Sequence, residues 1–293
     1  MSLWLPKFLQ DSLISPPALW GKLPSRGDFI RHNIKHNQGE ALQAWIAEQL
    51  LPSTVPAASS EPSKLPKAAV SRRLKADASL WHDLNQPASF SEEIVQPTVG
   101  HAGLPWCFVL PPGSLLFAAK EHVIGVWMAS SDKVGRQYPL LMIQTAAPRW
   151  IRQHFASHTQ QPCDWLFAVA RAMARTVYAD ETQVDKPTGG AQAPDHLTAL
   201  TTQLDALWQT MRPGWRQMLG GSAAAFDLAG AQALIGAPHP EDPVRHLDGV
   251  RYLPWANWPQ QLTSSGAAPS LRPAFWQQDM KGRFVAAAVN LNP

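Results

Sequence analysis

Runs of apolar residues in the middle of the chain predict the strands of a central β-sheet. Residues 106–110 and 114–118 flank a Pro-Pro-Gly turn, so the pattern predicts a hairpin there. Further strands are predicted at residues 18–20, 123–129, 138–144 and 283–291. The runs between 106 and 144 are apolar nearly throughout instead of alternating, which is typical of a sheet covered on both faces. The pattern therefore predicts an α/β fold with a mixed sheet between helices.

Apolar residues at helical spacing predict helices over residues 40–51, 164–178, 196–211 and, with a weaker period, 223–235. Pro52 ends the first helix, and Asp195 is a suitable N-cap for the third. In the second helix, Arg171 and Arg175 lie one turn apart on the side away from the apolar stripe. We interpret these two arginines as a solvated helix face, and a patch for an acidic partner is the alternative.

The segments between these elements are rich in Pro, Gly and Ser and are predicted to be loops, over residues 53–69, 180–193 and 236–273. Residues 70–100 are ambiguous, although their apolar positions suggest a short helix at residues 74–84. The sequence contains no internal repeat that we can detect. We expect a single domain over residues 1–293. Its motifs lie in residues 1–150, and residues 151–293 supply a helical cover, a loop-rich C-terminal portion and a closing strand.

Composition narrows the class of protein. Of the 293 residues, 45% are hydrophobic, which is ample for a core and argues against general disorder. The net charge is +3 and the charges are scattered, with no Lys or Arg run longer than Arg72-Arg73. The sequence therefore shows no basic stripe for nucleic acid.

Two cysteines, Cys107 and Cys163, provide neither a disulfide framework nor metal-ligand spacing, which fits a reducing compartment. We expect Cys107, inside a strand, to be a small buried residue. The first ten residues lack the apolar segment of a signal peptide, and no apolar run approaches the roughly 18 residues of a membrane span. We therefore expect a cytoplasmic protein.

Two loops far apart in the sequence have the same character. Residues 20–29 and 130–140 each place an acid and a base around a glycine, beside a predicted strand. We predict that these loops meet and serve recognition instead of catalysis. The candidate partner-binding residues are Lys22, Arg26, Asp28, Asp132 and Arg136. The alternative is that the same charges form internal ion pairs that pin the loops.

The sequence contains no recognisable catalytic or cofactor motif. Gly21-Lys22 is followed by Leu and Pro, where a phosphate-binding loop would have Ser or Thr. Ser25, Ser130 and Ser131 lack the Gly-x-Ser-x-Gly surroundings of a hydrolase nucleophile. His32 and His36 could share a helix face, but a surface pair is more common than a metal site. We expect no catalytic residue, cofactor or metal.

One rival hypothesis stays open. A small-ligand or nucleotide-binding enzyme could use a cleft formed by the Gly21–Phe29 and Ser130–Pro139 loops.

Three segments resemble the TagF/ImpM family of type VI secretion-associated proteins. Residues 20–29 resemble the N-terminal signature of that family, and residues 125–140 its second signature, a strand followed by an S-x-D-x-V-G-R loop. Residues 105–108 are similar to its intermediate Trp-x-Phe strand. Two separated signatures in the right order make the resemblance specific over about residues 18–145.

The resemblance implies a three-layer α/β/α sandwich without catalytic residues. It further implies a cytoplasmic accessory protein that represses assembly of the type VI secretion system post-translationally. Proteins of this family are thought to bind a forkhead-associated scaffold protein, in a pathway parallel to threonine phosphorylation.

Overall fold

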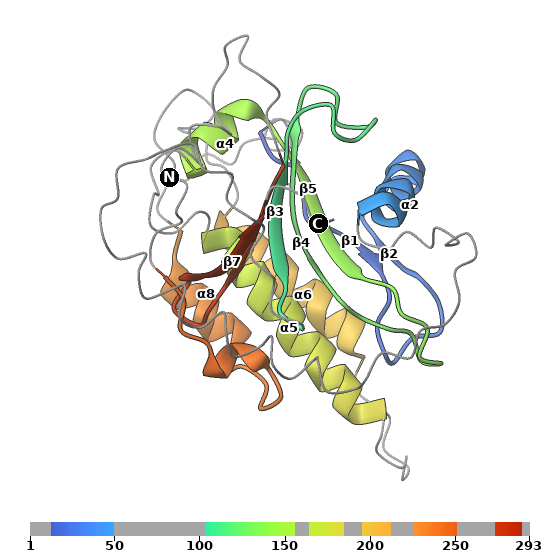
Figure 1. The fold of residues 1–293 in the computed structure, drawn as a ribbon, viewed down its shortest axis with the longest axis vertical. Helices are drawn as coiled ribbons and strands as arrows, with labels where there is room; N and C mark the ends of the chain where they lie inside the picture. Colours follow the sequence, from blue (N-terminus) through green and yellow to red (C-terminus); the bar gives the residue numbers. More distant parts are fainter. Residues whose placement is uncertain are drawn as a thin grey trace, which may run out of the picture.

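A single sheet crosses the centre of the computed structural model, which describes residues 13–49, 103–155, 164–184, 195–211, 226–250 and 273–288 (Figure 1). Its strands are β1 (Ala18–Gly21), β2 (Ile30–His32), β3 (Trp106–Leu110), β4 (His122–Met128), β5 (Leu140–Ala146), β6 (Ala274–Gln278) and β7 (Phe284–Ala288). They lie in the order β2-β1-β5-β4-β3-β6-β7. The C-terminal strands thus complete a sheet that begins near the N-terminus, because β6 pairs with β3.

Every pair of neighbouring strands in this sheet runs antiparallel, so the expectation of a mixed sheet was wrong. The expectation rested on strands that are apolar throughout, a pattern common in parallel sheets. Here the same pattern arises because both faces of an antiparallel sheet are buried. The α/β class is confirmed.

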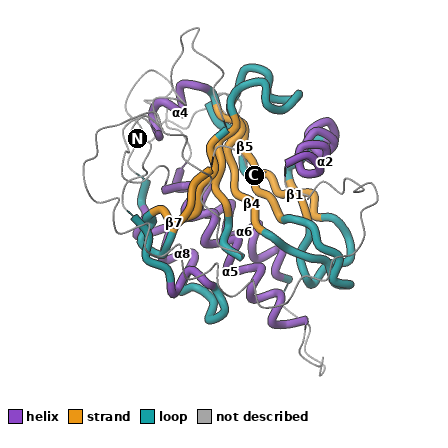
Figure 2. Tube along the Cα trace, viewed as in Figure 1, coloured by secondary structure: helices purple, strands orange, loops and turns teal. Residues whose placement is uncertain are grey.

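Helices lie on both sides of the sheet (Figure 2). One buried cluster joins α2 (His36–Gln49) to alternate strand residues such as Trp106 and Phe108. The residue between them, Cys107, belongs to the cluster on the other face. That second cluster also contains residues of α4 (Pro148–Phe155), α5 (Asp164–Val184), α6 (His196–Met211) and α8 (Leu228–Ile235). Successive residues of a strand therefore point to opposite faces of the sheet and pack into two separate cores.

Most predicted elements are present within a few residues. The first helix begins four residues earlier than predicted, at His36, and the second continues to Val184 instead of ending at residue 178. The third spans His196–Met211 as predicted. Within the predicted 223–235, the described helix is Leu228–Ile235.

The predicted strand at residues 114–118 is wrong. This segment is a compact turn in the connection between β3 and β4, closed by a hydrogen bond from Gly113 N to Ala118 O of 2.9 Å. Leu115 and Ala118 are buried, while Leu116 is 94% exposed. The apolar run anchors the turn on the core instead of pairing, and the partner of β3 is β4.

Other elements were missed or lie outside the described residues. The sequence reading missed β2, α4 and β6, and it placed Asp180 in a loop although Asp180 belongs to α5. The predicted loop at 53–69 and the short helix at 74–84 lie outside the described residues.

The topology explains how loops distant in sequence reach the same place. Both β1 and β4 are antiparallel to β5, which lies between them, so β1 and β4 run in the same direction. The segments that follow β1 and β4 therefore leave the sheet at the same end, roughly 10 Å apart before they turn. These segments are the two loops that the sequence singled out.

Candidate functional site

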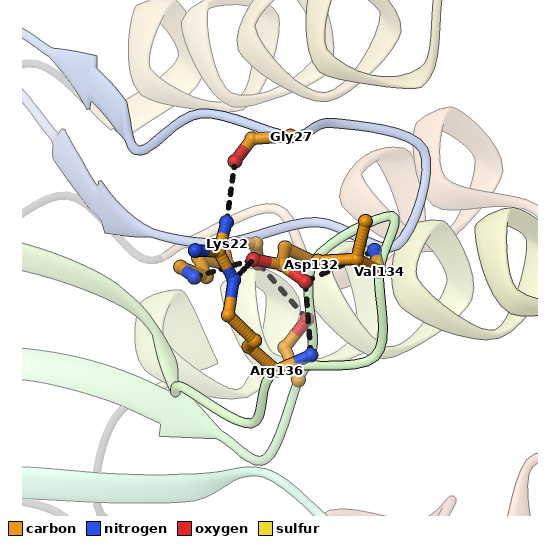
Figure 3. Close-up of polar contacts among 6 residues, drawn as sticks. Lys22, Gly27, Asp132, Val134 and Arg136 are labelled. Atoms are coloured by element: carbon orange, nitrogen blue, oxygen red, sulfur yellow. Dashed lines mark hydrogen bonds and ion pairs between the residues drawn. The ribbon is translucent and has the colours of Figure 1, made fainter.

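The two glycine-containing loops meet, as predicted (Figure 3). The backbone N–H of Lys133 donates to the carbonyl oxygen of Arg26 at 3.0 Å. The hydroxyl of Ser130 donates to the carbonyl oxygen of Lys22 at 2.9 Å. Backbone and side-chain contacts thus join the two loops into one surface.

Gly21 allows the first loop to start against the second. Its φ is +135°, and a Cβ at this position would lie 2.1 Å from the carbonyl oxygen of Pro139. Glycine is therefore required by both backbone conformation and space.

Asp132 is the centre of the contact between the loops (Figure 3). Its Oδ1 accepts from the backbone N–H groups of Val134 at 3.1 Å and Arg136 at 2.9 Å. Its Oδ2 accepts from Lys22 Nζ at 2.6 Å and Arg136 Nε at 2.6 Å. The Asp132 side chain is 0% exposed. Because both oxygens are occupied by internal donors, this carboxylate has a structural role.

The charge on Asp132 is stabilised by these donors. Burial by itself raises the pKa of the Asp132 carboxyl. The hydrogen bonds from Lys22, Arg136 and Val134 outweigh burial and hold that pKa well below its ordinary value. Lys22 is itself buried, and its ammonium lies 5.2 Å from the centre of the Phe29 ring. Lys22 and Asp132 therefore form an internal pin between the loops.

The remaining predicted residues are accessible. The side chains of Arg26 and Arg136 are 44% and 67% exposed. Asp28 is exposed and has no hydrogen bond or ion pair with another described residue. Two exposed apolar side chains, Phe29 and Val134, lie in the same loops. The structure thus divides the five predicted residues into a buried pair and three residues on the surface.

Two contacts, which the sequence pattern did not predict, attach the first loop to α5 and to the residue before α6. The backbone N–H of Ser25 donates to Asp180 Oδ2 on α5 at 2.9 Å. Arg26 forms an ion pair with Asp195, which precedes α6. Hydrogen bonds from Thr198 and Arg26 lower the pKa of Asp195 to about 2. Asp195 accepts from the backbone of Thr198, which confirms its predicted role as an N-cap.

A buried acid lies beneath this attachment. Asp180 is 0% exposed, and its Oδ1 lies 3.8 Å from Nε2 of His196. No sequence motif marks Asp180, because the pattern placed it in a loop beyond the helix. Asp180 connects α5 to the first loop, because it accepts the backbone N–H of Ser25.

The interpretation of the two arginines of α5 as a solvated face was wrong for Arg171, whereas Arg175 is exposed. Arg171 is 7% exposed and pairs with the buried Asp242 at 3.0 Å. Burial lowers the pKa of Arg171, and the nearby Asp242 opposes that shift. Arg175 donates to the carbonyl oxygen of Ile235, at the end of α8. Asp242 and Ile235 thus both bond to arginines of α5, and only Arg171 is buried by this contact.

The remaining candidate residues His32, His36 and Cys107 lie on separate elements. His32 lies in β2 and His36 begins α2, so these two residues do not share a helix face. Cys107 is 1% exposed, which confirms it as a small buried residue. Within the part of the chain that the structure describes, no three His, Cys, Asp or Glu side chains are grouped as metal ligands.

A shallow, open hollow of about 590 Å³ lies along α6 beside α8. Its lining residues are Asp195, Thr198, Ala199, Thr202, Gln203, Ala206 and Leu234. None of these lining residues belongs to the five predicted partner-binding residues, although Asp195 forms an ion pair with one of the five, Arg26.

None of the helices described here combines the length and apolar character needed to cross a membrane.

Comparison with known proteins identifies a family. The family model described as "TagF N-terminal domain, Type VI secretion system-associated" matches residues 18–72 and 101–192, which together make up half of the chain. No curated protein matches the sequence. The chain is also similar to the crystal structure of PA0076 from Pseudomonas aeruginosa PAO1, at 17% identity over 89% of this chain and 81% of that chain. The TM-score is 0.29, so we draw no conclusion from that structure.

The matched regions contain both loops and the strands that carry them. The resemblance seen in residues 20–29 and 125–140 is therefore confirmed by an independent comparison. The chain belongs to the TagF family of type VI secretion system-associated proteins.

Proposed function

We propose that this protein is a non-catalytic accessory protein that represses the type VI secretion system post-translationally. It would do so by binding a scaffold component, and the resemblance implies that this component is a forkhead-associated protein. Membership of a type VI secretion-associated family supports a role in that apparatus. The docking face that we propose consists of Arg26, Asp28 and Arg136 with the exposed apolar residues Phe29 and Val134.

The observation that carries the proposal is the buried pin beneath this face. Lys22 and Asp132, 110 residues apart, are joined at 2.6 Å inside the protein. Because the pin fixes both loops before any partner arrives, little conformational entropy is lost when the face is bound. Exposed charges held on fixed backbone also favour one partner over others.

Occupancy is the proposed mechanism of repression. A scaffold subunit held on this face is withheld from assembly, and no covalent step is needed. The saturation of Asp132 by internal donors supports a non-catalytic role, because a general base needs a free lone pair. The same saturation weakens the rival hypothesis of a nucleotide-binding enzyme at these loops.

We also propose that residues 1–293 form one domain and that the protein acts in the cytoplasm. The pairing of β6 with β3 supports a single domain, because it joins both halves of the chain in one sheet. The cytoplasmic location is what the resemblance to the family implies.

A pull-down from cells that carry the secretion gene cluster tests the proposal. The wild-type chain should capture the forkhead-associated scaffold, and Arg26→Glu or Arg136→Glu should capture less of it. Thermal unfolding of each variant separates two explanations. If both variants lose stability in proportion to their loss of binding, the arginines hold the loops in place. The proposal that they contact the partner would then be wrong. Capture of no scaffold by the wild type would overturn the proposed partner.

A further inference from the structure

The turn between β6 and β7 repeats the turn between β4 and β5. The first turn is Asp-Lys-Val-Gly-Arg, residues 132–136, and the second is Asp-Met-Lys-Gly-Arg, residues 279–283. Both follow strands that run in the same direction, because β4 and β6 are each antiparallel to β3. The chain therefore contains two D-x-x-G-R turns at the same end of one sheet.

The second turn has the internal bonding of the first. Asp279 Oδ1 accepts from the backbone N–H groups of Lys281 at 2.8 Å and Arg283 at 2.9 Å. Asp279 Oδ2 accepts from Arg283 Nε at 2.8 Å. The fourth residue, Gly282, has a φ of +75°, as Gly135 has +81° in the first turn. In both turns the aspartate is buried and its arginine is fixed by the Nε contact.

Each turn also captures a remote segment. Asp132 Oδ2 takes the ammonium of Lys22, whereas Asp279 Oδ2 takes the backbone N–H of Gly249 at 2.9 Å. The residue before Gly249 is an acid, Asp248. Asp248 forms an ion pair with Arg283, and its Oδ1 lies 3.8 Å from Lys281 Nζ. A carboxylate on an extended segment thus covers the arginine of the second turn.

The arginine of the first turn lacks such a carboxylate. Among the described residues, Asp132 is the one acid that pairs with Arg136, and the other polar contact of its guanidinium is to Gly27 O at 3.5 Å. The Arg136 side chain is 67% exposed, against 26% for Arg283. The first turn therefore has the same fixed arginine, but the nitrogen that would meet the carboxylate, Nη2, has only a long contact to a backbone carbonyl oxygen.

We propose that Arg136 binds a carboxylate of the partner protein, as Arg283 binds Asp248. This inference deepens the proposed function and rests on it. The partner segment should place an apolar side chain beside the acid, because the exposed Val134 occupies the position that Lys281 has in the second turn. Lys133, also exposed, adds a second positive charge at the edge. The expected ligand is an acidic and apolar segment of a protein.

NMR titration of the full chain tests this site without the scaffold. The probe is a blocked pentapeptide with the sequence of residues 246–250, His-Leu-Asp-Gly-Val, and the control replaces its Asp with Asn. The Asp peptide should shift the Arg136 Nε–H signal and the amide signals of Val134 and Gly135. The Asn peptide should bind at least about tenfold more weakly, because a charge-assisted hydrogen bond to the guanidinium is lost. Equal effects of the two peptides on these signals would overturn the inference.

The variant Arg136→Lys gives a second test. Lysine keeps a positive charge near Asp132 but lacks the terminal N–H groups of the guanidinium. The variant should lose the preference for the Asp peptide, and a retained preference would contradict the inference. Inorganic phosphate is the third probe. If phosphate shifts the same signals at lower concentration than the Asp peptide, the site recognises phosphate and the carboxylate proposal is wrong. Capture of the scaffold is measured separately, so a failed peptide test and a failed partner remain distinguishable.

Discussion

At the scale of residues, burial separates two aspartates that look alike in the sequence. Asp132 accepts four internal hydrogen bonds, whereas Asp28, in the loop bound to it, is exposed. The spacing around Gly135 predicts a turn, but burial of Asp132 depends on Lys22, 110 residues away. A local sequence pattern does not reveal a contact between residues so far apart. The sequence therefore predicted the two loops but not which of their charged residues are buried and which are accessible.

The lowered pKa of Asp132 predicts how stability depends on pH. In the unfolded chain its carboxyl has the ordinary value of 3.8, and the folded pKa lies below it. The ionised form therefore stabilises the fold fully above the ordinary value, and this contribution falls as the pH drops from there toward the folded pKa.

Denaturant unfolding between pH 3 and pH 7 checks this dependence. The difference in unfolding free energy between wild type and Asp132→Asn should be constant at neutral pH and shrink as the pH falls below 3.8. A difference that does not change with pH would show that the charge on Asp132 is not what stabilises the loops.

Gly135 and Gly27 form a matched pair for testing the turn. A Cβ at either position meets nothing within 4 Å, but Gly135 has a φ of +81°. Gly135→Ala should therefore destabilise the protein by about 1 kcal/mol, whereas Gly27→Ala should be neutral or slightly stabilising. Thermal unfolding of both variants measures the contrast. Equal effects would mean that the turn does not need the left-handed conformation.

At the scale of elements, clear apolar periods were predicted well and short or partly polar elements were missed. The α6 helix has the predicted bounds because its apolar residues recur at regular helical spacing. The three residues of β2 are too few to show a period. β6 ends in Gln277 and Gln278, which suggest a surface, yet both are buried and bonded to backbone carbonyl oxygens. Buried polar pairs of this kind are visible in a structure and not in a hydropathy pattern.

The α5 helix depends on its buried ion pair with the C-terminal segment. Arg171→Met leaves Asp242 buried without a counter-charge, which should cost about 3–5 kcal/mol. Adding Asp242→Asn removes the unpaired charge and keeps an oxygen that can accept from Val244 N, so much of the stability should return. The exposed Arg152→Met on α4 is the control and should change little.

Chemical denaturation of the single and double variants measures these effects. An Arg171→Met protein as stable as the wild type would contradict the buried pair. A double variant less stable than Arg171→Met would show that the penalty is not an uncompensated charge.

At the scale of the whole molecule, antiparallel topology turns distant sequence segments into one surface. The meeting of the two loops was predictable because both have the same composition and both follow a predicted strand. The sheet order was not predictable, since an apolar run does not reveal its neighbours or their direction. The second D-x-x-G-R turn was also missed, because five residues with three shared letters do not form a detectable repeat.

The central claim is that a fixed face made of two loops binds a protein partner. Its most direct test is the affinity of the purified chain for the forkhead-associated scaffold of the same gene cluster, measured by isothermal titration calorimetry. Lys133→Glu is the decisive variant, because the Lys133 side chain is exposed, has no bonding partner among the described residues and lies at the edge proposed to bind an acidic segment. Lys120→Glu, exposed in the connection between β3 and β4, is the matched control at the other end of the sheet. The account predicts at least about tenfold weaker binding for Lys133→Glu with unchanged stability, and wild-type affinity for Lys120→Glu. Wild-type affinity for Lys133→Glu, or no binding of the scaffold by the wild-type chain, would contradict it.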